Sequence, residues 1–124
     1  MVRRRLIETR GGVTKKVAIG GKKIYITANE FEDGTLGEIF LRLDREGEEL
    51  RVYDLLAIAM SVGLQHGVPL ATYVEKFKYQ KMEPAGFTSD PDIPNAGSVA
   101  DYLVRWLELR YADQIARECA EGVE

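Results

Sequence analysis

The sequence has 124 residues, 45% of them apolar and 30% charged, a composition that predicts one globular domain and excludes a disordered or fibrous chain. Its net charge of −3 divides into +7 over residues 1–23 and −10 over the rest, and this acidic total argues against non-specific binding of duplex nucleic acid. A single cysteine, Cys119, excludes an intramolecular disulfide and a multi-cysteine zinc site. The longest nearly apolar run, 55–64, is about half as long as a membrane-spanning helix, and no apolar signal-peptide core follows the first arginines, so we expect a cytoplasmic protein.

The first half of the chain predicts an antiparallel sheet. A basic arm over 1–12 precedes it, which can contact phosphate, dock on an acidic face of another subunit, or remain an exposed, mobile terminus. Three strands are then expected in succession, over residues 13–19, 22–30 and 37–43. The pair Gly20-Gly21 suits the positive backbone angles of a hairpin turn, and Asp33-Gly34 is a second turn signal.

The second half predicts helices. The expected segments are helices over 50–65 and 69–77, an irregular proline-rich loop over 80–97, a last helix that starts at Ser98, and an acidic helical tail over 113–124. Asp101, three residues after Ser98, matches a capping box. The sequence therefore predicts an α+β fold in which a three-stranded or larger antiparallel sheet is covered by about three helices, within a single ligand-binding domain over 1–124.

The residues that usually carry catalysis are sparse. His66 is the only histidine and follows a predicted helix, which favours a capping or surface role. Cys119 lies near the acidic end of the last helix, where a thiolate is disfavoured, so we expect a small buried or interface residue. Asp90 and Asp92 lack further ligands at a suitable spacing for a metal. We therefore predict no enzyme, no catalytic residue, no metal and no cofactor.

The loop over 80–97 is the strongest candidate for ligand binding. Phe87, beside Thr88, could stack on a planar ring, while Asp92 and Asn95 could bond to amide and hydroxyl edges of a ligand. Ser98 starts a helix whose N-terminus suits a phosphate. In the alternative interpretation Phe87 fills the core, and Asp92 and Asn95 only make turns.

Two arginines of the last helix are candidates for anion binding. Arg105 and Arg110 are five residues apart and so do not share a narrow helix face. Either could form a bidentate pair with a phosphate. The alternative is a solvated helix in which Glu108 and Asp113 balance them.

Four stretches carry a resemblance that covers about residues 3–107. They read RRRLIETR, KKVAIGGKKIYITANEFEDGTLGEIFLRL, AIAMSVGLQHGVPLATYVEKF and MEPAGFTSDPDIPNAGSVADYLVRWL. This order resembles the C-terminal accessory region of vitamin B12-dependent ribonucleotide reductases, with a tract like EPxGxTxxPxI before a helix that contains DYxxRWL. The barrel, the radical cysteine and the redox cysteine pairs of the reductase have no counterpart here, so the resemblance implies no nucleotide reduction.

A free-standing copy of this module is also similar to the first described family of Thoeris anti-defence sponge proteins of phages. That resemblance implies a homo-oligomer that binds a cyclic ADP-ribose isomer made by TIR-domain proteins, sequesters it without cleavage in the bacterial host cytoplasm, and also holds cyclic oligonucleotides in some members. It implies a pocket made from an aromatic, an asparagine and arginines. The predicted ligand-binding residues are Phe87, Thr88, Asp92, Asn95, Arg105 and Arg110.

Three functions follow, in order of preference. The first is sequestration of the cyclic signal by a non-enzymatic homo-oligomer with pockets at subunit interfaces and no membrane partner. The alternative is an accessory or regulatory nucleotide-binding piece of a split B12-dependent ribonucleotide reductase. The third, a single-stranded nucleic-acid binder that uses the basic arm and Phe87, is disfavoured by the acidic body of the chain.

Overall fold

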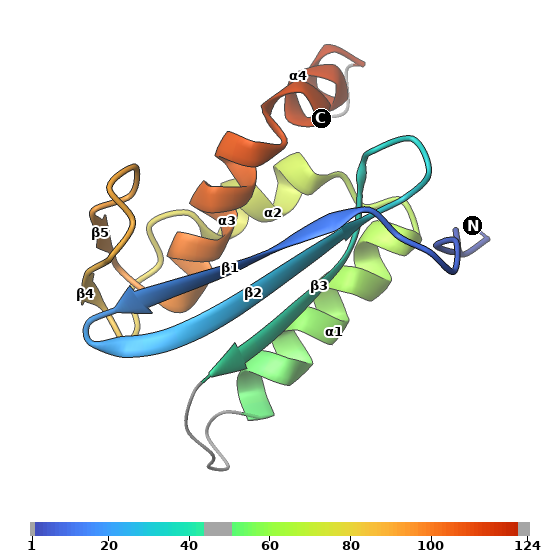
Figure 1. Ribbon diagram of the computed structural model, residues 1–124. Coiled ribbons are helices and arrows are strands. Elements are labelled where there is room, and N and C mark those ends of the chain that lie inside the picture. The colour runs from blue at the N-terminus through green and yellow to red at the C-terminus, as the bar shows by residue number, and fades with distance from the viewer. Residues whose placement is uncertain (1, 44–50, 122–124) are drawn as a thin grey trace. The chain divides into compact units, whose positions relative to one another are not determined.

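The computed structural model describes residues 2–43 and 51–121. These residues form a three-stranded sheet, a two-stranded sheet and four helices (Figure 1), which confirms the predicted α+β class. The chain divides into two compact units. Unit 1 comprises Met1–Lys16 and Ile24–Val68, and unit 2 comprises Val17–Lys23 and Pro69–Glu124.

The larger sheet has the predicted strands within one residue at each end. Its order is β1 (Gly12–Ile19), β2 (Lys22–Glu30) and β3 (Leu36–Leu43). Gly20 and Gly21 turn the chain between β1 and β2 with φ of 55° and 85°, angles that side chains rarely adopt. The alternation of β2 is as predicted, because Ile24, Ile26 and Ala28 are fully buried.

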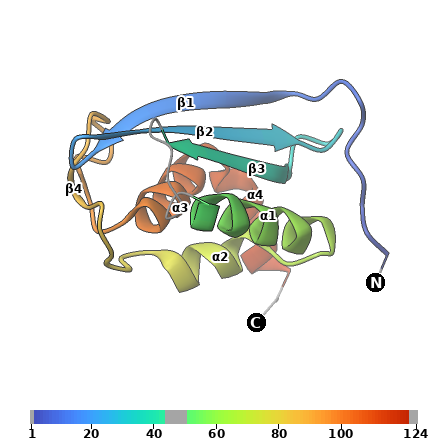
Figure 2. The same ribbon diagram turned by 90° about the horizontal axis from the view of Figure 1, so that it is seen from below.

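Helix α1 (Arg51–Gln65) packs against β3 in unit 1 and runs along it in both views (Figures 1 and 2). Its buried apolar side chains are Ala57, Met60 and Leu64. Polar contacts fix the register of helix on strand. The Ser61 hydroxyl accepts the Ile39 N–H at 2.8 Å, and the Gln65 amide donates to the Gly37 carbonyl at 3.0 Å. This strand therefore finds partners on the helix as well as within the sheet.

The basic arm is held against unit 1. The Arg4 backbone N–H donates to the Gln65 carbonyl at 2.7 Å, and its guanidinium lies 3.1 Å from Asp33 and 3.9 Å from the centre of the Phe31 ring. Arg3 donates to the Gln65 side chain at 2.7 Å. Arg3 and Arg4 are exposed, as one alternative expected, and both also make contacts within unit 1.

The turn after β2 is organised by the carboxylate of Asp33. It accepts the Thr35 N–H at 3.0 Å and the Thr35 hydroxyl at 2.6 Å. These bonds, with a smaller contribution from Arg4, lower the pKa of Asp33 to about 2. Gly34 supplies the positive φ of 87° that this turn requires.

Unit 2 contains the other three helices of the described residues. They are α2 (Leu70–Phe77), α3 (Val99–Arg110) and α4 (Ala112–Ala120). Ser98 is the N-cap of α3 and accepts the Asp101 N–H at 2.9 Å, as predicted. The predicted tail over 113–124 is helical as far as Ala120, while 122–124 lie outside the described residues. No helix in residues 2–43 and 51–121 has the length and apolar character needed to cross a bilayer.

Helix α4 holds the start of α2 through one carboxylate. The Glu118 side chain accepts the backbone N–H of Leu70 at 2.9 Å and that of Ala71 at 2.8 Å. Both N–H groups lie in the first turn of α2, where no partner exists within the helix. The negative charge also complements the positive end of the helix dipole. Glu118 therefore ties α2 to α4 within unit 2.

Candidate functional site

The loop predicted over 80–97 contains a short hairpin. Strands β4 (Gly86–Phe87) and β5 (Asn95–Ala96) pair antiparallel, with Phe87 opposite Asn95. The turn between β1 and β2 anchors this hairpin within unit 2. The Gly20 N–H donates to the Phe87 carbonyl at 2.9 Å, and the Ser89 N–H donates to the Ala18 carbonyl at 3.0 Å. Backbone hydrogen bonds therefore join the loop to this turn.

Phe87 lies on the surface. Its side chain is 81% exposed, so the alternative that it fills the core is wrong. Its cross-strand partner Asn95 is also exposed. An exposed aromatic ring beside an amide is suited to stacking on a planar ligand and bonding to its edge.

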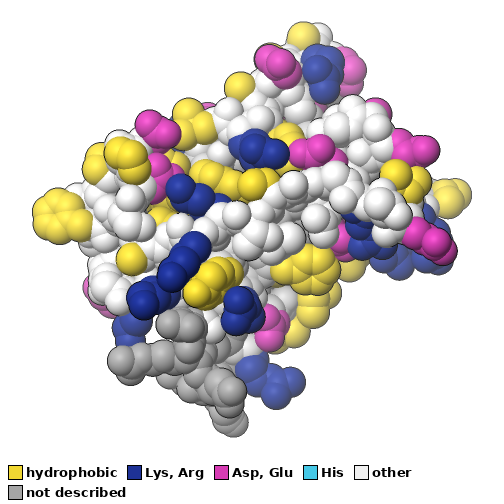
Figure 3. Space-filling view, viewed as in Figure 1, with side chains coloured by type: hydrophobic (Ala, Val, Ile, Leu, Met, Phe, Trp, Pro, Cys, Tyr) yellow, Lys and Arg dark blue, Asp and Glu magenta, His cyan; other side chains and the backbone are white. Residues whose placement is uncertain are grey.

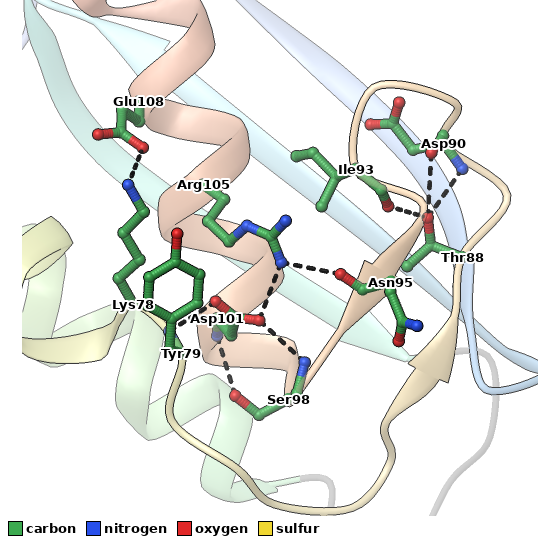
Figure 4. A network of polar contacts seen from close by, with 11 residues as sticks. Lys78, Tyr79, Thr88, Asp90, Ile93, Asn95, Ser98, Asp101, Arg105 and Glu108 are labelled. Atoms are coloured by element: carbon green, nitrogen blue, oxygen red, sulfur yellow. Dashed lines mark hydrogen bonds and ion pairs between the residues drawn. The ribbon is translucent and has the colours of Figure 1, made fainter.

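Thr88 and Asp92 belong to the turn that connects β4 and β5. The Thr88 hydroxyl accepts the Asp90 N–H at 3.0 Å and bonds to the Ile93 carbonyl (Figure 4). The Asp92 N–H donates to the Asp90 carboxylate at 2.9 Å, while the Asp92 side chain is exposed. These contacts give Thr88 and Asp90 a scaffold role, and they leave the Asp92 carboxylate at the surface.

A buried pair fixes the turn to α3. The Tyr102 hydroxyl donates to the Asp90 carboxylate at 2.7 Å, and the Tyr102 side chain is fully buried. Burial first, and then this bond to Asp90, raises the pKa of Tyr102 well above its usual value of 10. The phenol therefore stays protonated and remains a donor.

Replacing Tyr102 by phenylalanine is expected to lower the free energy of unfolding by about 1–3 kcal/mol at neutral pH, because the buried Asp90 carboxylate loses a donor. Since folding raises the pKa of Tyr102, its contribution to stability is complete below pH 10 and is lost as the pH rises toward the folded-state value. Urea unfolding from pH 7 to 11 should therefore show the two proteins converging. A constant difference across this range would contradict the assignment.

Asp101 is the centre of a polar network at the start of α3 (Figure 4). Its side chain is 2% exposed. One carboxylate oxygen accepts the Tyr79 N–H at 2.7 Å, and the other accepts the Gly97 N–H at 2.9 Å and an Arg105 N–H at 3.2 Å. One buried charge thus holds two backbone segments and one cationic side chain.

Tyr79 presents a second exposed ring. Its side chain is 66% exposed, and its backbone has φ of 68°, which is rare for an aromatic residue. The guanidinium of Arg105 lies 5.6 Å from the ring centre, and the ammonium of Lys78 lies 5.4 Å from it. Lys78 also pairs with Glu108 at 2.8 Å, and this bond raises the pKa of Lys78. The strained backbone at Tyr79 is held by its bond to Asp101.

The two predicted arginines have different surroundings. Arg105 donates to the Asn95 carbonyl at 2.8 Å and so joins β5 to the ring of Tyr79. Arg110 lies in the last turn of α3, where its guanidinium is 5.8 Å from the Tyr111 ring. The structure therefore connects Arg105 directly with the β4–β5 hairpin and places the Arg110 guanidinium beside the Tyr111 ring.

We define the β4–β5 site as Tyr79, Phe87, Asn95 and Arg105. Contacts link its members in series, from Phe87 through Asn95 and Arg105 to Tyr79. It offers two exposed rings, an amide and a cation, a set that suits a ligand with a planar base and a phosphate. Among residues 2–43 and 51–121, no group of three or more histidine, cysteine or acidic side chains is placed to hold a metal ion.

The sequence interpretation missed Tyr79 and the wider role of Asp101. The signal for Tyr79 was weak, since it consists of one aromatic residue after a lysine at the end of a helix. His66 is exposed, and its ring bonds to the Val62 carbonyl at 2.9 Å, in agreement with the predicted capping or surface role. Cys119 is exposed on α4, so it is not a buried residue of this chain, and its alternative role as an interface residue stays a prediction.

In comparisons with known proteins, the chain is similar in sequence to vitamin B12-dependent ribonucleotide reductases. The model of the TSCPD domain matches residues 4–111. The chain is 48% identical over 111 residues to a vitamin B12-dependent ribonucleotide reductase of Streptantibioticus cattleyicolor, a match that covers 89% of this chain and 18% of the reductase. Reductases of the same name from Agrobacterium fabrum and Rhodopirellula baltica are 46% and 39% identical, over 88% of this chain and 9% and 11% of their own lengths. No solved structure is significantly similar to the chain.

Proposed function

Because the chain belongs to the TSCPD domain family, we propose that it is a non-catalytic accessory piece of a vitamin B12-dependent ribonucleotide reductase and that it binds a nucleotide. The observation that carries this proposal is the length of the match. The chain is 48% identical to a reductase of which it spans only 18%, so it corresponds to a small part of that enzyme. Such a part would act on the remaining catalytic body, as a nucleotide-dependent regulator or a docking piece.

The β4–β5 site supports nucleotide binding by its chemistry. Phe87 is the exposed ring for a base, and Asn95 lies opposite it to bond to the base or the ribose. Arg105 supplies a guanidinium 5.6 Å from the centre of the Tyr79 ring, and this cation would pair with a phosphate. Asp101 positions Arg105 through an ion pair at 3.2 Å and does not itself have to contact the ligand.

The test of this function is reconstitution with a B12-dependent reductase that lacks its own copy of the domain. We expect this chain to co-elute with that catalytic subunit and to change its rate of nucleotide reduction when nucleoside triphosphates are added. The Phe87→Ala variant should still co-elute but lose the nucleotide effect. Failure of the wild-type chain to bind the subunit or to alter its rate would contradict the proposal.

Phe87→Ala is expected to weaken nucleotide binding by about 1–3 kcal/mol, the usual loss for one stacked base. Its effect on the unfolding free energy should be small, within about 0.5 kcal/mol, because the side chain is 81% exposed. Isothermal calorimetry and urea unfolding measure the two quantities. Leu109→Ala, which removes another exposed apolar side chain of unit 2, is the matched control and should change neither.

A second function, sequestration of a cyclic ADP-ribose isomer, is favoured by the same exposed ring. Adenine could stack on Phe87 while Arg105 pairs with the pyrophosphate, and pockets completed by a second copy of the chain would enclose the ligand. Calorimetry with the glycocyclic isomer should then show micromolar or tighter binding without any reductase subunit. Heating the complex should release the ligand intact. A hydrolysed ligand, or no heat of binding at micromolar protein, would exclude this function.

A further inference from the structure

The outer face of the larger sheet carries aromatic and basic side chains in unit 1. In this face the residues of β1, β2 and β3 alternate with those that point to the core. Tyr25 lies opposite Arg42, and Thr27 lies opposite Phe40. Thr14 joins the second row, since its hydroxyl is 3.0 Å from that of Thr27. Figure 3 shows Lys and Arg side chains gathered around hydrophobic ones over these strands.

Two cations share the ring of Tyr25. The Arg42 guanidinium lies 4.4 Å from the ring centre, and the Lys16 ammonium lies 5.8 Å from it. Because the Tyr25 ring attracts both cations, the two positive charges stay close together over Tyr25. Both side chains are exposed, so their remaining N–H groups can reach an anion in solvent.

Phe40 adds an open aromatic surface beside these charges. Its side chain is 54% exposed although it lies in a strand of the sheet. Phe40 is diagonal to Tyr25 in the register of β2 and β3, a separation of about 7–8 Å between positions. In the row beyond Phe40, the carboxylate of Glu38 is paired with Arg10 and bonded by the Asn29 amide, so its charge is already compensated.

We propose that this outer sheet face, formed by Lys16, Tyr25, Thr27, Phe40 and Arg42, binds single-stranded nucleic acid. A base would stack on Phe40, and phosphates of the same strand would pair with Arg42 and Lys16 in the neighbouring row, beside Tyr25. An exposed ring beside a row that carries two cations fits a base with its phosphates, whereas an acidic peptide would pair only with the cations. The acidic remainder of the chain opposes the phosphates, but only to the extent that its charges lie close to this face, since charges more than about 8–10 Å apart are largely screened at physiological salt.

Fluorescence anisotropy with a labelled ten-nucleotide single strand tests the proposal, with DNA and RNA versions as separate arms. We expect at least one single strand to bind the wild-type chain more tightly than a ten-base-pair duplex. Phe40→Ala should weaken binding about tenfold, and Phe40→Leu should weaken it nearly as much because stacking needs the ring. Arg42→Ala should reduce the slope of log affinity against log salt by about 0.7.

Two controls separate this face from the rest of the molecule. Val52→Ala removes an exposed apolar side chain of α1 in the same unit and should leave oligonucleotide affinity unchanged. Leu109→Ala removes an exposed apolar side chain of unit 2 that lies outside the β4–β5 site, and it should also leave this affinity unchanged. The proposal is overturned if Phe40→Ala and Arg42→Ala bind like wild type, if duplex binds at least as tightly as both single strands, or if a ten-residue polyglutamate competes as well as the oligonucleotide.

Discussion

Replacing Asp101 by alanine is expected to lower the free energy of unfolding by about 3–5 kcal/mol, the usual cost of removing one member of a buried, hydrogen-bonded ion pair. The carboxylate is 2% exposed and accepts the N–H groups of Tyr79 and Gly97 besides pairing with Arg105. Alanine offers no acceptor to any of the three. The two backbone N–H groups would then be left without this partner, at about 1–3 kcal/mol for each that stays buried.

Urea unfolding at pH 7 measures this loss, and two variants make it interpretable. Asp101→Asn keeps one acceptor oxygen and should cost less than Asp101→Ala. Asp113→Ala removes an exposed aspartate from the first turn of α4 and should cost less than about 1 kcal/mol. A loss below 1 kcal/mol for Asp101→Ala would show that the carboxylate does not hold this part of unit 2 together.

The same network explains how Asp101 would affect a ligand it does not touch. Without the carboxylate, Tyr79 would lose the bond that holds its left-handed backbone, and Arg105 would lose its ion pair while keeping its bond to the Asn95 carbonyl. Nucleotide affinity should therefore fall together with stability. Arg105→Lys, which keeps the charge but not the planar donor geometry, should lose affinity with a smaller change in stability.

The strands, helices and turns could be predicted because each depends on nearby residues. Alternating apolar positions predict β2, the glycine pair predicts the turn after β1, and Ser98 predicts the start of α3. These signals act over a few residues, so one sequence is sufficient to find them. The packing of α1 on β3 was harder to predict from the sequence. The bonds from Ser61 and Gln65 to the strand join positions 22 and 28 residues apart.

The candidate site was only partly predictable for the same reason. Phe87 and Asn95 were found from the composition of their loop, and the structure pairs them across a hairpin. Asp101 was interpreted only as a capping residue, because nothing local indicates that its side chain reaches Tyr79, 22 residues earlier. The positive φ of the Tyr79 backbone, which positions its ring, depends on this distant acceptor. A short-range sequence pattern does not show that the two residues meet.

Replacing Gly20 by alanine is the second change for which we expect a large effect, a loss of about 3 kcal/mol in the free energy of unfolding. Gly20 has φ of 55°, a conformation that costs a residue with a Cβ atom about 1–2 kcal/mol. A Cβ atom at this position would also lie 2.3 Å from the Ala85 carbonyl oxygen. Backbone must move to relieve this contact, which would strain the bond between the Gly20 N–H and the Phe87 carbonyl.

Gly21→Ala separates the effect of the Cβ contact on stability from the effect of the positive φ. Gly21 also has a positive φ, of 85°, but a Cβ atom there would have no atom within 4 Å. Gly21→Ala should therefore lower the free energy of unfolding by only about 1–2 kcal/mol. The amide NMR shifts of Phe87 and Thr88 in this variant should match those of wild type. Gly20→Ala should change both shifts and weaken nucleotide binding, because the turn is hydrogen-bonded to β4 at Phe87. Equal losses of stability in the two variants, with unchanged shifts at Phe87, would mean that the turn does not position the β4–β5 site.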